Sequence, residues 1–449
     1  MARCRTASIA RSLQTQQPAL NRQLRRWLGA ELRRLQPVVA ASAAKTKADH
    51  YRKHFRAFPH ACLLIFHGLS RGESLRQSYA AFATCRGLVV LSGLALAGSQ
   101  ARASADQGLG VSYSQFAASN TSRRASFLAE IIPSLVSRVR QAGQLAQAGL
   151  PPDLHLFDST FLRLSLALSP WLPNSGQSDI PGVRLHIQYA PTLDLPEHIL
   201  VSDTRTSDRQ GFDAAILDDP ARLERLAGQT LAIDLGYYGH VRFARLRAAL
   251  VHFVSRLHHQ ASYRVEAEVP VQQPLPDLYP ERIRVLADQR ITLGSPANST
   301  GAVLPGLRLV TAEVAPLPKA ARRGAKTVTY RVLTDRWNLS ASDVIQLYLW
   351  RWQIELFLRW LKSHVHLPRM LGYSANAVEM TVWLAVIVHL LTILAARALG
   401  WTRRSPTLLS QLPWALAQLT EDDDDALSSP ATQLALPSPA WTQMIAAPT

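Results

Sequence analysis

The sequence predicts a mixed α/β fold with a helical N-terminal region and a β-rich insertion. Helical patterns dominate before Pro151, short apolar and β-branched segments bounded by Pro, Gly and Asp follow it, and helical patterns return from Ser340. Strands that alternate with helical stretches in this way are typical of an α/β or α+β domain. At about 150 residues per domain, the 449 residues leave room for two to four domains.

Changes in composition and in helical and strand patterns divide the chain into five expected regions. These are a helical basic region (1–150), the first part of the core (151–260), a β-rich insertion (261–330), the second part of the core (331–400) and an acidic, partly disordered tail (401–449). The tail is rich in Ser, Pro and Ala and contains the run EDDDD at 421–425.

The charge of the chain points to a polyanionic partner. The net charge is +17 and the pI is near 10.4, which is typical of proteins that bind nucleic acid or an anionic membrane. Residues 1–60 hold 13 Lys and Arg against two acidic residues, whereas residues 401–449 hold two basic and five acidic residues. The N-terminal end is therefore the expected electrostatic footprint.

A membrane-spanning protein is disfavoured. The longest apolar stretch, Met380–Ala396, has 17 residues and includes His389, whereas a spanning helix needs about 20 apolar residues. We therefore expect a buried helix there. No continuous apolar segment follows the first arginines, so a cytoplasmic protein is expected. Three cysteines without a CxxC motif exclude a disulfide scaffold and give no sign of a zinc site.

The clearest helix in the N-terminal region covers Asn21–Leu35. At 100° per residue its leucines and Trp27 fall on one side, and arginines fall on the other. An arginine face suits contacts with DNA phosphates, although a merely solvated face fits the same pattern. The expected DNA-contacting residues of this helix are Arg22, Arg25, Arg26 and Arg33, with Arg25 at the border of the face. A second helical pattern, Ser126–Ala146, should break at Pro133.

The segment after Pro151 carries five expected strands and one helical stretch. The helical stretch, Asp213–Leu226, lies between the third and fourth strands. The expected strands are Leu154–Phe157, Val183–Tyr189, His198–Ser202, Thr230–Ile233 and Leu250–Arg256.

The insertion and the C-terminal part follow. Eight of the 27 prolines lie in 261–330, together with the strand-like pieces Tyr263–Val269 and Leu307–Val314 and a turn-rich cluster at 293–305. From a capping residue at Ser340, two long helices are expected to reach about Gly400.

Three carboxylates are the candidate catalytic residues. Asp158 and Asp234 each end an expected strand, and Glu355 lies on the helix LYLWRWQIELFLRWLK. Acidic residues at the carboxyl ends of strands lie where open α/β sheets place their sites, although such an Asp also serves as a turn former or helix cap.

The helix with Glu355 favours the functional interpretation. Tyr348, Arg351, Glu355 and Lys362 fall within a 60° arc on a helix that is otherwise strongly apolar. A single polar stripe on such a helix faces a site or a ligand; the alternative is a row of surface salt bridges. Three carboxylates close together need a cation, and Mg²⁺ prefers oxygen ligands. Two such ions support phosphoryl transfer, with Arg351 and Lys362 available to grip phosphates.

The stretch Y348-LW-R351-WQI-E355-LFLRWL-K362 resembles the YREK signature, Y-x2-R-x3-E-x6-K, of DDE transposases of the insertion-sequence-four family. FDST around Asp158 and IDLGYYGHVRF around Asp234 are similar to the first and second acidic motifs of that family. The likeness is good over residues 150–400, weaker over 60–150, and absent from 1–50 and 405–449. Ser159 stands where many relatives have glycine.

The resemblance implies an RNase H-like core, with Asp158 on the first strand, Asp234 after the fourth, and Glu355 on a helix after the insertion. It implies cut-and-paste DNA transposition with two Mg²⁺ ions, for which Mn²⁺ can substitute, held by Asp158, Asp234 and Glu355. Tyr348, Arg351 and Lys362 would hold terminal phosphates. The implied partners are double-stranded DNA at terminal inverted repeats, target DNA and a second copy of the chain; the implied location is the bacterial cytoplasm, at the nucleoid.

Two further residues are expected near DNA, each with an open alternative. Arg256 could reach DNA or form a structural ion pair, and Tyr237 could stack on an unpaired end base or pack in the core. The 14 histidines show no metal-binding spacing, so core or surface roles are expected for them. A DNA nuclease of the same fold without joining activity, and an inactive DNA-binding derivative of a transposase, remain alternative functions.

Overall fold

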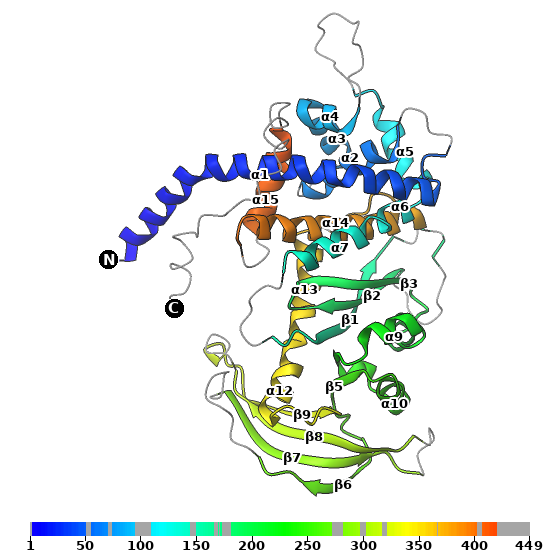
Figure 1. Cartoon of the computed structure of the whole chain (residues 1–449), viewed down its shortest axis with the longest axis vertical. Helices are drawn as coiled ribbons and strands as arrows, with labels where there is room; N and C mark the ends of the chain where they lie inside the picture. Colours follow the sequence, from blue (N-terminus) through cyan, green and yellow to red (C-terminus); the bar gives the residue numbers. More distant parts are fainter. Residues whose placement is uncertain are drawn as a thin grey trace, which may run out of the picture. The chain divides into compact units, whose positions relative to one another are not determined.

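The computed structural model describes residues 2–50, 55–70, 74–94, 109–143, 150–165, 169, 171–172, 181–271, 282–296, 302–316, 321–365, 367–401 and 406–419. Contacts within the chain divide it into two compact units (Figure 1). The sheet unit comprises residues 145–359, and the helical unit comprises residues 1–144 and 360–449. The predicted acidic run 421–425 lies outside the described residues.

The sheet unit contains a nine-stranded mixed sheet with the order β3-β2-β1-β4-β5-β9-β8-β7-β6. β1, β4 and β5 are parallel, and every other neighbouring pair is antiparallel. The predicted mixed α/β class is thus confirmed. The strands are β1 (Leu154–Arg163), β2 (Gly182–Ala190), β3 (Leu195–Asp203), β4 (Thr230–Ile233), β5 (His252–Arg256), β6 (Tyr263–Glu268), β7 (Ile283–Leu293), β8 (Leu304–Val314) and β9 (Val328–Thr334).

The strands at the centre of the sheet are buried on both faces. All four residues of β4 are buried, as are Leu154–Phe157 at the start of β1. Parallel strands covered on both faces need such continuous apolar runs, and this explains why their sequences lack a polar face. All five strands expected between residues 150 and 256 are present.

The insertion does not form a separate body, because its strands continue the same sheet. β9 pairs with β5 through Val254 and Thr334, and β8, β7 and β6 follow outward from β9 (Figure 1). Two strands, β7 and β9, were not expected from the sequence. Within the described residues, the strands of the expected insertion thus extend the central sheet.

Helices cover the sheet. The helical stretch expected at Asp213–Leu226 is divided by a short π-helix and preceded by α8, and Figure 1 shows α9 and α10 together beside β1 and β5. The covering elements are α8 (Asp208–Phe212), the π-helix η2 (Asp213–Leu217), α9 (Pro220–Leu226), the 3-10 turn η3 (Leu235–Tyr237), α10 (His240–Ala248) and α12 (Ala341–Trp350), followed by α13 (Trp352–Ser363).

The predicted helix start at Ser340 is confirmed, but the helix that follows is interrupted. Ser340 accepts a hydrogen bond from the Asp343 N–H in a capping box. α12 ends at Trp350, and Arg351 forms a tightened turn in which the Arg351 N–H bonds the Tyr348 carbonyl and the Ile354 N–H bonds the Arg351 carbonyl. Arg351 therefore lies at the junction between α12 and α13.

The helical unit is built from both ends of the chain. Its elements are α1 (Ala2–Thr46), α2 (Ala57–Leu69), α3 (Leu75–Thr84), α4 (Arg86–Ser92), α5 (Tyr113–Ser122), α6 (Ser126–Ala129), α7 (Ile132–Gln141), α14 (Ala375–Ala398) and α15 (Pro406–Ala417). The expected break at Pro133 is present between α6 and α7. Within this unit, α14 contacts the N-terminal helices α2, α5 and α7.

The apolar run at 380–396 belongs to α14. This helix is long and apolar enough to cross a membrane, but 89% of its most apolar window is buried within the chain. His389 in the middle of the helix is fully buried, and this burial lowers its pKa to about 3. The burial agrees with the expected core helix, because a lipid-facing helix would expose its apolar surface.

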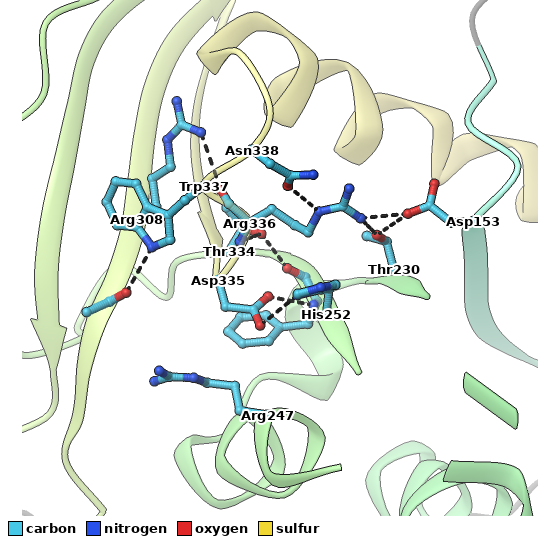
Figure 2. A network of polar contacts seen from close by, with 12 residues as sticks. Asp153, Thr230, Arg247, His252, Arg308, Thr334, Asp335, Arg336, Trp337 and Asn338 are labelled. Carbon is cyan, nitrogen blue, oxygen red and sulfur yellow. Dashed lines mark hydrogen bonds and ion pairs between the residues drawn. The ribbon is translucent and has the colours of Figure 1, made fainter. Parts of the chain in front are cut away.

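A polar network joins the return from the insertion to the amino ends of the central strands (Figure 2). Arg336 donates to Asp153 at 2.6 Å and also bonds Thr230, and Asp335 accepts from the Phe253 N–H at 3.1 Å. Asp335 also contacts His252 at 3.0 Å. These charge-assisted bonds fix β9 against β5 and β4, and so set where the chain enters α12.

Candidate active site

The two aspartates are brought together by parallel pairing. Phe157 of β1 lies opposite Ile233 of β4, and Asp158 and Asp234 are the next residue of each chain segment. Asp234 directly follows the carboxyl end of β4. Asp158 lies within β1, because this strand does not end at Phe157 as expected but continues to Arg163. Since β1 and β4 run in the same direction, the two carboxylates stand at the same level of the sheet, where β4 ends. Both side chains are partly accessible, with 22% of Asp158 and 43% of Asp234 exposed.

Arg351 connects all three candidate carboxylates. Its Nη2 donates to Glu355 Oε1 at 2.7 Å, its Nη1 lies 3.9 Å from Asp158 Oδ2, and its Nε lies 3.8 Å from Asp234 Oδ1. Only 12% of the Arg351 side chain is exposed. The structure therefore gathers Asp158, Asp234 and Glu355 around a single half-buried guanidinium.

Tyr348 approaches the site from the last turns of α12. Its hydroxyl donates a hydrogen bond of 2.9 Å to Asp234 Oδ1. Its ring lies 5.9 Å from the ring of Tyr330 in β9, over which the Arg256 guanidinium lies at 5.7 Å. Arg256 thus makes a cation–π contact with Tyr330. The sequence reasoning missed Tyr330, which only the pairing of β9 with β5 brings here.

The electrostatics of the site follow from the crowding of charges. Burial raises the pKa of Asp158 to about 6, and Asp234 and Glu355 add to the rise while Arg351 and the Ser159 N–H oppose it. Burial alone would lower the pKa of Arg351, but Asp234, Tyr348 and Glu355 together raise it above its ordinary value. Burial and the neighbouring Asp234 raise the pKa of Tyr348, which keeps its hydroxyl protonated as a donor.

Asp158 Oδ1 accepts two hydrogen bonds from the other side of the site. The Ser159 N–H donates at 2.8 Å and the Tyr237 hydroxyl at 3.4 Å. The ring of Tyr237 packs edge-on against Phe157 at 5.3 Å and is only 3% exposed. The Tyr237 ring thus packs in the core beside Phe157.

The donor chemistry at this site fits a hard divalent cation. Three carboxylates converge on one cationic group, and carboxylate oxygens are the ligands that Mg²⁺ prefers. Among the described residues, no three Asp, Glu, His or Cys side chains are close enough to one another to hold one metal ion. At this site the Arg351 side chain lies between the carboxylates. The three carboxylates thus fit the ion in the kind of ligand they offer.

The other predicted DNA contacts lie in the helical unit. Lys362 is on α13, seven residues after Glu355; it is partly buried, which lowers its pKa. Arg22 and Arg26 are exposed on α1, opposite the buried Leu24 and Leu28, whereas Arg33 is half-buried.

Arg25 has a different environment from its neighbours. Its Nη1 donates to the Gln418 carbonyl at 3.1 Å, just beyond the end of α15. The Arg25 side chain is therefore turned toward the end of α15.

The histidines of the core have structural partners. His186 bonds Ser202 at 2.9 Å and is fully buried, and His155 contacts Glu197 at 3.2 Å. These contacts agree with the core roles expected for them.

Comparisons with known proteins bear on the same segment. Residues 150–391, more than half of the chain, match the family described as "Transposase DDE domain". This range contains Asp158, Asp234 and Glu355 together with the whole sheet.

Two curated relatives align with a similar length of the chain. A putative transposase, y4zB, from Sinorhizobium fredii is 27% identical over 244 residues, which cover 54% of this chain and 61% of that protein. A probable transposase for insertion sequence element IS5377 from Geobacillus stearothermophilus is 26% identical over 242 residues, which cover 54% of this chain and 56% of that protein. The alignments thus span less than two thirds of each relative.

A structure of the piggyBac transposase synaptic complex with hairpin DNA aligns with 91% of this chain and 83% of that chain, at 10% identity and a TM-score of 0.38. The family match, which covers the sheet and all three converging carboxylates, establishes that the chain belongs to the DDE-domain transposase family.

Proposed function

We propose that this protein is a DNA transposase that cuts and joins DNA at the ends of a mobile element by metal-assisted phosphoryl transfer. The observation that carries the proposal is the convergence of Asp158, Asp234 and Glu355 around Arg351, where β4 ends. Membership of the DDE-domain family and the net charge of +17 support DNA as the substrate.

Asp158, Asp234 and Glu355 are the residues that would hold two Mg²⁺ ions, with Mn²⁺ as a substitute. When bound, such ions activate a water or a 3′-hydroxyl and stabilise the leaving oxygen of the scissile phosphate. Tyr348 orients the Asp234 carboxylate through its 2.9 Å hydrogen bond, and two donors hold Oδ1 of Asp158 so that Oδ2 faces Arg351. The chain thus presets the direction of both aspartates before DNA arrives.

Arg351, Tyr348 and Lys362 are the proposed contacts to the terminal phosphates. A guanidinium at the centre of the carboxylates is well placed to turn toward a phosphate beside the scissile bond, which it binds in a bidentate manner. Tyr330, which lies beside Tyr348, and Arg256 over its ring extend the cationic and aromatic surface. The exposed Arg22 and Arg26 would also contact DNA phosphates.

The arrangement of the strands supports an RNase H-like core of the insertion-sequence-four type. β1, β2 and β3 are antiparallel, β4 and β5 run parallel to β1, and Asp158 and Asp234 lie on the first strand and after the fourth. Glu355 follows on a helix after the β-rich insertion, and Tyr348, Arg351 and Lys362 complete the YREK spacing. A bacterial cytoplasmic protein that works as a homodimer, one copy per DNA end, is the corresponding proposal.

The proposed reaction consists of a hydrolytic nick, attack of the freed 3′-hydroxyl on the opposite strand to give a hairpin, reopening of the hairpin and strand transfer into target DNA. The test is incubation of the purified chain with Mg²⁺ and duplex DNA that carries the sequences flanking its gene. Nicks, hairpins and joined products at those flanks are expected. Cleavage without joining would favour a nuclease of the same fold, and binding without cleavage would favour an inactive DNA-binding derivative.

A further inference from the structure

A second group of polar residues lies directly behind Asp158, on the side away from Arg351. It consists of Ser159, Asp208, Arg184 and Tyr237, which we call the Asp208 network. Its members come from β1, α8, β2 and η3. The residues are far apart in the sequence, and the acidic motifs do not point to Asp208 or Arg184.

Asp208 is placed by the docking of α8 on β2. Ser207 caps α8 through a capping box with Gln210, so the helix begins at a defined residue. Gly211 permits the close approach of this helix to the sheet, because a Cβ at that position would lie 1.9 Å from the imidazole of His186. The His186 ring is itself fixed by Ser202 on β3. Asp208 therefore stands over β1 at the level of Ser159.

Arg184 on β2 balances the charge of Asp208. Arg184 Nη1 lies 3.1 Å from Asp208 Oδ1 and also donates to the Thr206 carbonyl at 3.2 Å. The Ser159 hydroxyl donates to the same Oδ1 of Asp208. A hydroxyl that donates to a paired carboxylate is held in one rotamer, so the contact restrains both the side chain and the backbone of Ser159.

This restraint reaches the active site through a single peptide group. The N–H of Ser159 donates to Asp158 Oδ1 at 2.8 Å. Tyr237 gives the same oxygen a second donor at 3.4 Å, and its hydroxyl also interacts with Ser159. The ring of Tyr237 is locked in the core by Phe157 and Phe212, at 5.3 Å and 5.6 Å. Oδ1 of Asp158 is therefore oriented from behind by two donors, and Oδ2 is left facing the centre of the site.

We propose that Tyr237 and the Ser159–Asp208–Arg184 chain are positioning residues that set the direction of the Asp158 carboxylate for metal binding and phosphoryl transfer. The proposal rests on the proposed function in one respect, namely that Asp158 is a metal ligand. Groups that orient a ligating carboxylate change metal affinity or activity by roughly 10-fold to 100-fold when they are removed.

The test uses single-atom or isosteric changes with matched controls from the sheet unit. Tyr237→Phe removes the hydroxyl that reaches Asp158, and Tyr238→Phe removes the neighbouring hydroxyl, which bonds His240 at 3.1 Å instead. Ser159→Ala removes the contact with Asp208, and Ser255→Ala removes a hydroxyl on β5 that bonds the Arg256 carbonyl instead. Asp208→Asn keeps the shape of the side chain but weakens the ion pair with Arg184.

The first readout is Mn²⁺ binding to the full-length chain without DNA, followed by electron paramagnetic resonance. Tyr237→Phe is expected to weaken Mn²⁺ binding roughly 10-fold and Ser159→Ala or Asp208→Asn about 3-fold to 10-fold, with the two control variants unchanged. The double variant of Ser159 and Asp208 should lose no more than the larger single loss, because the two residues act through one contact. The thermal midpoints of all variants should stay within a few degrees of the wild type.

The second readout is cleavage of duplex DNA carrying the gene-flanking sequences. The test variants should have a lower kcat and need a higher Mg²⁺ concentration for half-maximal rate, while their Kd for DNA stays constant. Ser159→Thr, which keeps a hydroxyl at this position, should retain most of the wild-type rate. Wild-type Mn²⁺ affinity in Tyr237→Phe, Ser159→Ala and Asp208→Asn would overturn the proposal. If wild-type protein cleaves no DNA but the Mn²⁺ pattern holds, the proposed function fails and the positioning network stands.

Discussion

The hydroxyl of Tyr348 donates a 2.9 Å hydrogen bond to Oδ1 of Asp234, although 114 residues separate them in the sequence. The contact links the last turns of α12 to the carboxyl end of β4, and Arg351 and Glu355 follow within the next two turns. Tyr348 therefore contacts a candidate catalytic carboxylate, in addition to its proposed role at phosphate.

Tyr348→Phe should reduce DNA cleavage by about 10-fold, because Asp234 loses a donor that fixes its orientation. The ring contact with Tyr330 at 5.9 Å is kept in this variant, so the fold should be unaffected. Cleavage rates measured across a Mg²⁺ titration, with circular dichroism as the control for folding, check this expectation. A rate equal to wild type at low Mg²⁺ would show that the hydrogen bond has no catalytic role.

Arg351→Gln should destabilise the chain in EDTA, because three carboxylates would lose their shared positive partner. Added Mg²⁺ should raise the thermal midpoint of this variant more than that of wild type, since the ion replaces the missing charge. Differential scanning fluorimetry in EDTA and in Mg²⁺ measures both midpoints. Equal Mg²⁺ responses would argue against a shared site for the ion and the guanidinium.

The stability of the DNA-free chain should depend on pH through Asp158. Its folded pKa of about 6 lies above the unfolded value of about 3.9, so the folded chain keeps a proton that the unfolded chain loses. Protonated Asp158 therefore adds up to about 3 kcal/mol to the free energy of unfolding below pH 4, and this contribution is lost as the pH rises through 6. Asp158→Asn should therefore raise the thermal midpoint at pH 7.5 in EDTA but not at pH 4. A higher midpoint at both pH values would point to a cause other than ionisation.

The sheet extension offers a matched pair of ion pairs on β7 and β8. Arg308 and Asp288 are 5% and 2% exposed and bonded at 2.6 Å, whereas Arg284 and Glu313 are 72% and 33% exposed at the same distance. Arg308→Ala should cost about 3–5 kcal/mol because it leaves Asp288 buried and unbalanced. Arg284→Ala should cost less than about 1 kcal/mol. Thermal or urea unfolding of the two variants measures the difference, and similar losses would contradict the assigned burial.

The arginine face of α1 should act on DNA affinity alone. Replacing the exposed Arg22 and Arg26 by Ala should weaken binding to any duplex and lower the slope of log K against log salt by about two. Gln36→Ala, also exposed on α1, is the uncharged control. Fluorescence anisotropy at several salt concentrations provides the slopes. An unchanged slope of log K against log salt would show that Arg22 and Arg26 do not contact DNA phosphates.

The apolar segments before the two candidate aspartates could be predicted from the sequence, and β4 has the expected bounds. The second half of β1 was not predicted, because Asp158 and the polar residues after it interrupt the apolar run while pairing with β2 carries the strand on to Arg163. β7 was missed because its polar residues alternate irregularly, and the sheet tolerates this through bulges between Val285 and Ala287 and between Ile291 and Leu293. Pairing across such bulges is decided by the neighbouring strands, which no local pattern records.

The composition of the site was predicted better than its contacts. Spacing placed Tyr348, Arg351 and Glu355 on one stripe, and the structure keeps them together. The sequence around Arg351 contains no Pro or Gly that would predict a turn, so a continuous helix was expected there. The partnership of Ser159 with Asp208 depends on the docking of α8 across 49 residues, and for this reason it could only be seen in the folded chain.

The most direct test of the account is Mg²⁺-dependent cleavage of the gene-flanking DNA by wild-type protein and by Glu355→Gln, with DNA affinity measured in parallel. The account predicts cleavage and joining by the wild type, loss of both in Glu355→Gln, and equal Kd values for DNA. Cleavage by Glu355→Gln at the wild-type rate, or no cleavage by the wild type, would contradict it.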